Sequence, residues 1–367
     1  MTTSTDTPPD SSAEGPATAP AEAAAERVLG AILGAVDLLS MYLGDRLGYY
    51  RSLADEGPAT ATELAARTGT DPRYTREWLE QQAVTSLLTV EQSLDPVFAL
   101  PDGMREVLTD ASSLDYLAPV ARLIASVGPV LPHLLRAYRD GSGVSWDDLG
   151  DDARMGQADA NRPWYEHRLA GALASVPDLH ERLSAPGARI LDVGFGGGWS
   201  TIALARAYPS ATLTGVDIDE PSVAMARTHA AAAGLADRIT FTLGDAGSLE
   251  GEGYDAAFAF ECVHDMPRPV EVLAAVHRAL APGAPLVVMD EAVADEFAPH
   301  GDEVERLMYG FSLFVCLPDG LSSPPSVGTG TVMRPSTLAA YGRDAGFSTC
   351  ETLPIEDFGF WRFYRLQ

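Results

Sequence analysis

Residues 190–201 have the sequence Ile-Leu-Asp-Val-Gly-Phe-Gly-Gly-Gly-Trp-Ser-Thr. An apolar run ends at Asp192, and a helical pattern opens at Thr201, which predicts a strand, a tight loop and a helix. The loop contains Gly194, Gly196, Gly197 and Gly198. Glycines let a loop bend sharply and approach a ligand, and the helix behind it presents free N–H groups. The loop is therefore predicted to bind a nucleotide.

The glycine spacing also indicates which nucleotide is bound. A dinucleotide-binding loop has the pattern G-x-G-x-x-G, which from Gly194 would require a glycine where this chain has Trp199. The spacing therefore disfavours NAD. Asp192, at the end of the strand, would repel a pyrophosphate but suits a ligand that carries an ammonium group. S-adenosylmethionine (SAM) is such a ligand.

Composition limits the possible partners. The 367-residue chain is long enough for two domains, and its 52 acidic against 25 basic residues give a formal charge of -27. No nucleic-acid or membrane partner is expected, because phosphate neutralisation dominates that kind of affinity. A neutral or cationic small molecule fits better. All basic residues are Arg, which excludes mechanisms that need a lysine.

The sequence predicts a cytoplasmic protein. Cys262, Cys316 and Cys350 have neither metal-ligand spacing nor an even count, which suits a reducing compartment and predicts no metal site. The first residues carry no Lys or Arg and no apolar block, so no secretion signal is expected. The longest apolar stretch, residues 28–44, is interrupted by Asp37 and is expected to be a core or dimer helix, not a membrane span.

The N-terminal part is predicted to be a tail followed by a winged helix. Residues 1–24 contain few large apolar groups, which predicts a disordered tail. Within residues 25–110, a helix around Leu64, a turn at Gly69 and a second helix starting at Pro72 predict a helix-turn-helix.

Charge decides what this winged helix does. A short wing hairpin is predicted within residues 87–100, and residues 61–110 contain four Arg and nine acidic residues. DNA binding would need a basic recognition helix. The domain is therefore expected to mediate homodimerisation.

Residues 111–186 are expected to connect this domain to a second one. Residues 115–141 and 162–183 have amphipathic helical patterns and are predicted to cover the catalytic site. Between them, residues 146–154 (Trp-Asp-Asp-Leu-Gly-Asp-Asp-Ala-Arg) are predicted to form an acidic loop, either a cation site or, more often for such runs, a solvated linker.

From residue 187 onward strands and helices alternate, which predicts an α/β fold with a parallel sheet. The predicted strands span residues 189–193, 212–217, 239–243, 254–260 and 285–290. The predicted helices span residues 200–208, 221–233, 269–280 and 335–345. Two final strands, residues 348–355 and 360–366, are joined by a loop short enough to make them antiparallel.

This order of elements resembles the class I SAM-dependent methyltransferases from about residue 25 to the end of the chain. The chain is most similar to actinobacterial and mycobacterial small-molecule methyltransferases with an N-terminal winged-helix dimerisation domain, relatives of the plant-type O-methyltransferases. The resemblance implies that residues 187–367 form a Rossmann-like, mostly parallel seven-stranded sheet with an antiparallel C-terminal hairpin.

The resemblance also places the cofactor at three strand ends, which converge in one crevice. Asp192 to Gly198 match the family pattern D-x-G-x-G-x-G and would cradle the methionine part of SAM. Asp217 matches the acidic residue that binds both ribose hydroxyls, and Asp245 would lie near the adenine. Asp219 competes for the ribose role, but its position favours a helix cap. The predicted cofactor residues are Asp192, Gly194, Gly196, Gly198, Asp217, Ile218, Asp245, Ala246 and Glu261.

Residues 260–267, Phe-Glu-Cys-Val-His-Asp-Met-Pro, follow the fourth strand, where plant-type O-methyltransferases have His-Asp-Trp. The resemblance implies that His264 deprotonates the acceptor hydroxyl, although Met266 replaces the Trp. Methyl transfer is an in-line displacement that needs positioning and a base. A carboxylate at Asp290 or Glu291 would support the imidazolium. A structural histidine, bonded to a neighbouring backbone group, is the alternative.

An insertion, residues 292–334, is too long for an ordinary connection and is predicted to be a lid. It carries large apolar groups at helical spacing, from Leu307 to Cys316. The predicted acceptor-binding residues are Met308, Phe311, Phe314 and Met333 of the insertion, with Trp164 and Tyr165 on the other side. Core or dimer packing remains open as the alternative for these residues.

These features predict a cytoplasmic, homodimeric SAM-dependent methyltransferase that acts on a hydroxyl of a small, partly apolar molecule. Two alternatives remain open: N- or C-methylation or a non-methylating use of SAM on the same fold, and a SAM-binding winged-helix regulator. The chain departs from metal-dependent catechol-type methyltransferases, which use a catalytic lysine.

Overall fold

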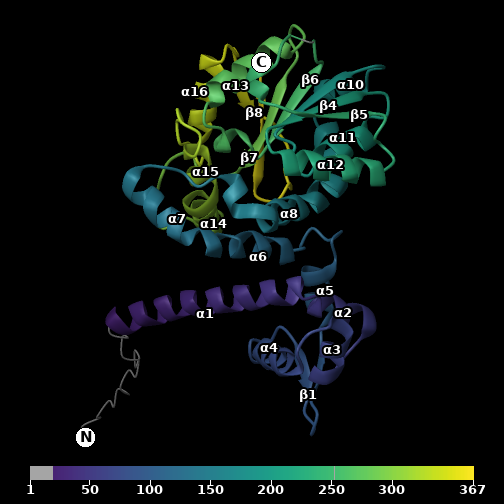
Figure 1. The fold of residues 1–367 in the computed structure, drawn as a ribbon. Helices are drawn as coiled ribbons and strands as arrows, with labels where there is room; N and C mark the ends of the chain where they lie inside the picture. Colours follow the sequence, from purple (N-terminus) through teal and green to yellow (C-terminus); the bar gives the residue numbers. More distant parts are fainter. Residues whose placement is uncertain (1–19, 252) are drawn as a thin grey trace, which may run out of the picture.

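The computed structural model describes residues 20–251 and 253–367 (Figure 1). Residues 1–19 of the predicted tail lie outside the described residues. Residues 20–24 belong to α1 (Pro20–Arg46), so helical structure begins before residue 25. The helix starts early because Pro20 suits a first helical position and the residues after it are mostly alanine and glutamate.

A winged helix follows α1. Its elements are α2 (Tyr49–Glu56), α3 (Ala61–Thr68), α4 (Pro72–Val84), β1 (Thr89–Glu91), β2 (Val97–Ala99) and α5 (Asp102–Thr109). Thr60 and Glu63 form a capping box at the start of α3, and Asp71 caps α4. Gly69 ends α3 with a left-handed φ of 69°. The predicted helix-turn-helix and wing are confirmed.

Helix α1 carries a long apolar surface that the rest of the described chain leaves open. Trp78 Nε1 donates to the Ser40 carbonyl at 2.9 Å and so joins α4 to the C-terminal half of α1. Beyond this anchor the helix projects away from the winged helix (Figure 1). Its side chains that are about half exposed are Val28, Leu29, Ile32, Leu33, Val36, Leu39 and Leu43. Its length and composition would suffice to cross a membrane, and they equally suit a helix that packs on another protein surface.

Helices connect the winged helix to the sheet domain. They are α6 (Ala118–Ala125), α7 (Val127–Asp140), α8 (Trp146–Trp164), the π-helical turn η1 (Tyr165–Leu169), α9 (Ala170–Ala174) and α10 (Pro177–Ser184). The acidic loop predicted for residues 146–154 is wrong, because these residues form the first turns of α8. Ser145 and Asp148 make a capping box there, and acidic residues stabilise a helix N-terminus. Gly150 has a non-helical backbone (φ 75°) and bends α8.

The second domain is built on a seven-stranded sheet with the order β5-β4-β3-β6-β7-β9-β8. The strands are β3 (Arg189–Val193), β4 (Thr212–Asp217), β5 (Ile239–Leu243), β6 (Ala256–Phe260), β7 (Leu286–Glu291), β8 (Cys350–Thr352) and β9 (Trp361–Leu366). The first five are parallel, and β9 lies antiparallel between β7 and β8. The predicted fold is confirmed. Strand order reverses at β3, so a crevice is expected beyond its carboxyl end.

Alternate residues of the strands pack on two helical layers. Ile190 faces a cluster that includes residues of α11 (Trp199–Ala207) and α12 (Glu220–Ala232). Leu191 faces a cluster that includes residues of α13 (Pro269–Ala279) and α16 (Pro335–Asp344). Side chains along a strand point to opposite faces, so one β3 strand supports both layers.

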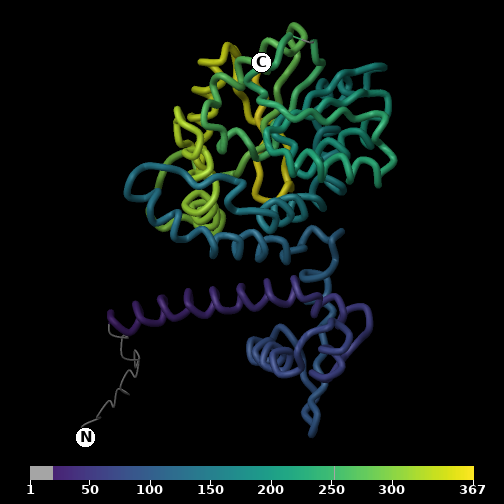
Figure 2. Tube along the Cα trace, in the orientation of Figure 1, coloured from purple at the N-terminus to yellow at the C-terminus, as the bar shows by residue number. Residues whose placement is uncertain are grey.

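The insertion between β7 and α16 contains three helical pieces: α14 (Glu303–Phe311), the π-helical turn η4 (Ser312–Cys316) and α15 (Leu317–Leu321). These pieces pack against α7 and against the short turn η3 (Val263–Asp265) after β6. Figure 2 shows the yellow-green insertion beside the blue connecting helices. The insertion thus lies next to His264.

Candidate active site

The glycine loop after β3 is shaped by its backbone. Gly194, Gly196 and Gly198 all have positive φ, at 67°, 52° and 77°. A Cβ on Gly194 would lie 2.8 Å from the Cys262 side chain, whereas a Cβ on Gly196 would have nothing within 4 Å. The loop is therefore closely packed underneath and open at Gly196. Helix α11 begins directly behind it, and the first N–H groups of a helix have no partner within the helix itself.

Asp192 lies beneath this loop. Its Oδ2 accepts hydrogen bonds from the Ser200 and Thr201 hydroxyls at 2.7 and 2.6 Å, and the residue is 1% exposed. Burial raises the pKa of Asp192 to about 7. Asp192 thus ties β3 to the first turn of α11.

Asp217, at the end of β4, reaches the glycine loop. One carboxylate oxygen accepts from the Gly196 N–H at 2.8 Å, and the other accepts from the Asp219 N–H at 2.9 Å. Burial raises the pKa of this carboxyl above its usual range. The next residue, Ile218, is largely exposed. Asp217 is therefore fixed where a ligand on the loop would meet it, with lone pairs left to accept further hydrogen bonds.

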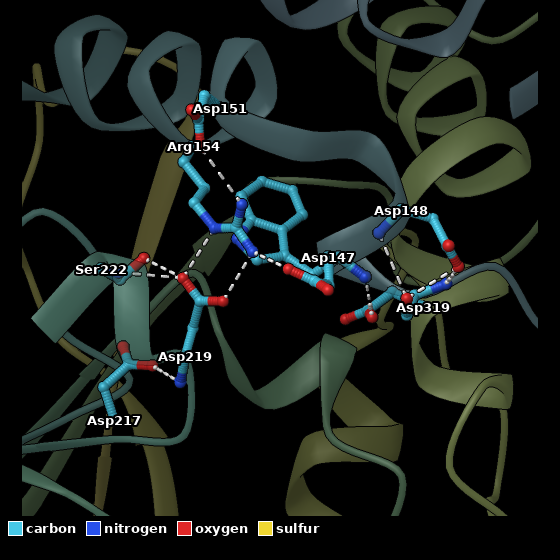
Figure 3. A network of polar contacts seen from close by, with 10 residues as sticks. Asp147, Asp148, Asp151, Arg154, Asp217, Asp219, Ser222 and Asp319 are labelled. Atoms are coloured by element: carbon cyan, nitrogen blue, oxygen red, sulfur yellow. Dashed lines mark hydrogen bonds and ion pairs between the residues drawn. The ribbon is translucent and has the colours of Figure 1, made fainter. Parts of the chain in front are cut away.

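Asp219 caps α12 as predicted, accepting from the Ser222 N–H at 3.0 Å. It also pairs with Arg154 of α8, at 2.8 and 2.9 Å, and Arg154 reaches Asp147 at 2.7 Å (Figure 3). We use the name Arg154 clasp for the set formed by Arg154, Asp147 and Asp219. The Arg154 side chain is only 5% exposed. Sequence reasoning missed the Arg154–Asp219 pair. The signal that could have revealed it is the single Arg at the end of the acidic run of residues 146–154.

The start of α8 also contacts the insertion. The Trp146 N–H donates to Asp319 of α15 at 2.7 Å (Figure 3). Burial raises the pKa of Asp319 to about 7. The start of α8 therefore joins the end of β4 to the insertion, across the carboxyl edge of the sheet.

The remaining predicted cofactor residues follow β5 and β6. Asp245 follows β5 and accepts from the Gly247 N–H at 2.8 Å, which caps η2 (Ala246–Ser248). Ala246 is buried. Asp245 also lies 3.7 Å from the Arg268 guanidinium.

Glu261 follows β6 in a strained conformation, with φ 50° although it is not a glycine. Its carboxylate accepts hydrogen bonds from Trp361 Nε1, Asn161 Nδ2 and, at 3.3 Å, Gln157 Nε2. Exclusion of water raises the pKa of Glu261 to about 7. Asn161 and Gln157 belong to α8, so the same helix that holds the clasp also holds Glu261.

His264 is buried on η3 among three carboxylates. Its Nδ1 lies 2.9 Å from Asp290 Oδ1 and 3.3 Å from Glu291 Oε2, and its Nε2 lies 3.4 Å from Asp265 Oδ1. Burial lowers the pKa of His264, but these carboxylates together raise it well above its usual value. The structure thus brings both predicted supporting acids to one ring nitrogen and leaves Nε2 on the other side.

The predicted acceptor residues fall into two groups. Trp164 packs on Phe358 and Trp361, and Tyr165 packs on Phe260, at the α8 end of the crevice. The residues from the insertion are the buried Met308, the partly buried Phe311, the exposed Phe314 and the buried Met333. Met333 belongs to the core cluster beneath α16. Sequence reasoning missed Cys316, whose Sγ lies within 4.8 Å of donor atoms of His264 and Asp265.

Comparisons agree with this architecture. Residues 190–283 match the family described as "Methyltransferase domain", and residues 34–110 match the "Rv2258c-like winged HTH domain". The ubiquinone biosynthesis O-methyltransferase of Hahella chejuensis is 31% identical over 177 residues, 47% of this chain and 68% of that protein. The chain therefore belongs to the SAM-dependent methyltransferases.

Solved structures share the whole fold. The mitomycin 7-O-methyltransferase MmcR has a TM-score of 0.72 at 24% identity, covering 95% of this chain and 98% of that one. Human N-acetylserotonin methyltransferase, solved in complex with SAM, has a TM-score of 0.71 at 18% identity, covering 96% and 99%. At these identities the likeness concerns the fold.

Proposed function

We propose that this methyltransferase acts on a hydroxyl of a small, partly apolar molecule, as a cytoplasmic homodimer with His264 as the general base. The observation that carries the proposal is the contact between His264 Nδ1 and Asp290, at 2.9 Å on a buried ring. A carboxylate on Nδ1 orients the ring so that Nε2 can accept the proton, and because the carboxylates raise the pKa of His264 well above its usual value, Nε2 must first lose its own proton. Asp290 and Glu291 then stabilise the imidazolium.

The residues at the crevice fit SAM. Gly196 offers open backbone, Asp217 is a fixed carboxylate suited to a diol, and Asp245 and Ala246 stand at the next strand end. Asp192 and Glu261 both have pKa values raised to about 7, so a nearby cation would stabilise their charged forms. When bound, SAM supplies an electrophilic methyl group on its sulfonium. The chain positions the acceptor and excludes water around it.

We assign acceptor binding to apolar residues of the insertion and of the connecting helices. The residues are Met308, Phe311 and Phe314 of the insertion, together with Trp164 at the end of α8 and Tyr165 of η1. Aromatic and thioether side chains suit a flat, partly apolar molecule. Met333 instead packs in the core cluster beneath α16.

The proposal is tested by incubating the full chain with SAM labelled in its methyl group, against a panel of simple phenols, simple amines and a producer-cell extract. Mass spectrometry of the products is expected to show the label on oxygen. Label found only on nitrogen or carbon would contradict O-methylation. The acceptor found in this way serves the turnover assays below.

We predict that Arg154→Met weakens SAM binding by about tenfold or more, because an unpaired Asp219 would repel Asp217 and loosen its N–H contact. Calorimetry with SAM measures this change. Arg122→Met is the matched control, since Arg122 is also buried, with Asp45 at 2.9 Å and Asp159 at 3.1 Å, but contacts none of the cofactor positions. If Arg154→Met and Arg122→Met lose the same affinity for SAM, the Arg154 clasp only stabilises the fold and has no specific role in SAM binding.

The apolar surface of α1 is assigned to the homodimer interface. We predict that Ile32→Asp combined with Val36→Asp converts the dimer to a monomer, because two charges would enter a desolvated contact. Sedimentation velocity measures the mass. Leu94→Asp, at an exposed position of the wing, is the control and is expected to stay dimeric. A dimer that survives the double substitution would exclude α1 from the interface.

A further inference from the structure

We propose that His264 Nε2, Asp265 Oδ1 and Cys316 Sγ form a binding site for Zn²⁺ and that zinc bound there inhibits methyl transfer. Metal binding depends only on this cluster, whereas inhibition also rests on the proposed role of His264 as base. The three donors come from η3 and η4, which are far apart in sequence, so no ligand spacing along the chain reveals them.

The distances suit one ion. The three donor atoms all lie within 4.8 Å of one another, and Nε2 is 3.4 Å from Oδ1. Zinc bonds of about 2.0–2.3 Å in a tetrahedral arrangement separate the donors by roughly 3.3–3.8 Å. Small side-chain adjustments therefore bring the cluster to coordination geometry.

The electrostatics call for a cation between the donors. With Nδ1–H directed at Asp290, His264 Nε2 faces Asp265 Oδ1, so a neutral ring would set two acceptors against each other. Asp265 Oδ1 is buried, and the weak S–H donor of Cys316 lies beside the Asp265 carboxyl group. A proton on Nε2 relieves the repulsion. Zinc would replace that proton and gain the Cys316 sulfur as a third ligand, with the ring proton and the thiol proton released to solvent.

The surroundings resemble the outer shell of a zinc site. Ligating histidines usually donate their other ring N–H to a carboxylate, as His264 does to Asp290. Cys316 is buried, and the buried Thr331 hydroxyl lies beside its thiol. Loss of the thiol proton on metal binding would leave this hydroxyl beside a thiolate, and a metal-bound water would give it a further partner.

The donor set selects the metal. A thiolate and an imidazole favour zinc over magnesium or calcium, which prefer oxygen ligands. Three protein ligands leave the fourth position open. With Nε2 bound to the metal, its lone pair no longer accepts the acceptor proton, so turnover is expected to fall as zinc is added and to recover with a chelator.

The binding test uses Co²⁺ as a spectroscopic substitute for zinc on the full chain. Wild type is expected to show a thiolate-to-cobalt charge-transfer band that zinc abolishes by displacement. Cys316→Ser is expected to lose the band, and its zinc affinity is expected to fall by more than the roughly 10–100-fold that loss of an outer-shell partner costs. Cys262→Ser is the matched control, because this second thiol of the crevice donates to the Val193 carbonyl at 3.2 Å and lies outside the cluster. Circular dichroism checks that each variant folds, and Asp265→Asn provides a second route to the same loss.

The outcomes separate the two claims. Absence of the band in folded wild type, or a band that survives Cys316→Ser, overturns the site. Inhibition by zinc that is equal in wild type and Cys316→Ser overturns the assignment of inhibition to this cluster. If the cobalt band behaves as expected but zinc leaves turnover unchanged, the metal site stands, while inhibition and the base role of His264 fail.

Discussion

Replacing His264 by Ala lowers kcat by about 10²–10⁴-fold, the usual contribution of a positioned base, while SAM binding measured by calorimetry stays as in wild type. The reason is that Asp290 holds Nδ1, so Nε2 is the ring nitrogen left to take the acceptor proton. Added imidazole is expected to restore part of the lost turnover, because it supplies a base of the same kind in the space left by the side chain. Turnover is measured with the acceptor found by product analysis.

His277→Ala is the control for this experiment. His277 packs on Phe347 with a ring separation of 4.6 Å, on α13 and outside the crevice. It is expected to keep its turnover. An unchanged kcat in His264→Ala would leave His264 with the structural role that remained open from the sequence, and positioning alone would then account for the reaction.

Asp217→Ala weakens SAM and S-adenosylhomocysteine binding by about 100-fold or more. Each hydrogen bond to a charged group contributes about 1.5–3 kcal/mol, and each 1.4 kcal/mol corresponds to tenfold in affinity. The substitution also removes the acceptor of the Gly196 N–H at 2.8 Å, so the loop loses its contact with β4. Calorimetry measures both ligands.

A ligand analogue isolates the ribose contact from this effect on the loop. Wild type is expected to bind the 2′-deoxy analogue of S-adenosylhomocysteine more weakly than S-adenosylhomocysteine itself. The Asp217→Ala variant is expected to bind the two compounds equally. If Asp217→Ala still prefers the parent compound, the ribose contact belongs to another residue, and Asp219 is the competing carboxylate that the sequence offers. Glu220→Ala, at the exposed first residue of α12, serves as the control.

The sequence predicted the fold because its main local patterns, such as the glycine loop and the short connection before β9, each favour one structure. The glycine loop follows from positive φ angles that other residues adopt at a cost, and the antiparallel β9 follows from a loop too short for a crossover. The cap at Asp219 follows from its position before Pro221. These features depend on neighbours in sequence.

The parts that were missed depend on distant residues or on a competing local signal. The acidic run at residues 146–154 suggested a loop, but the Ser145 capping box and the helix dipole favour a helix there. Arg154 meets Asp219 across 65 positions, and Cys316 meets His264 only because the insertion folds back onto η3. Such pairings are set by packing, which no periodicity encodes.

Helix α8 sets the spacing between several residues of the crevice. It holds Asp219 through Arg154, Glu261 through Gln157 and Asn161, and an aromatic cluster through Trp164, all along one continuous segment. Each residue turns an α-helix by about 100°, so a one-residue insertion or deletion after Arg154 would swing Asn161 and Trp164 away from their partners together. The length of this segment is therefore fixed by the site, whereas length variation among related chains should accumulate in the insertion, where loops join the helical pieces.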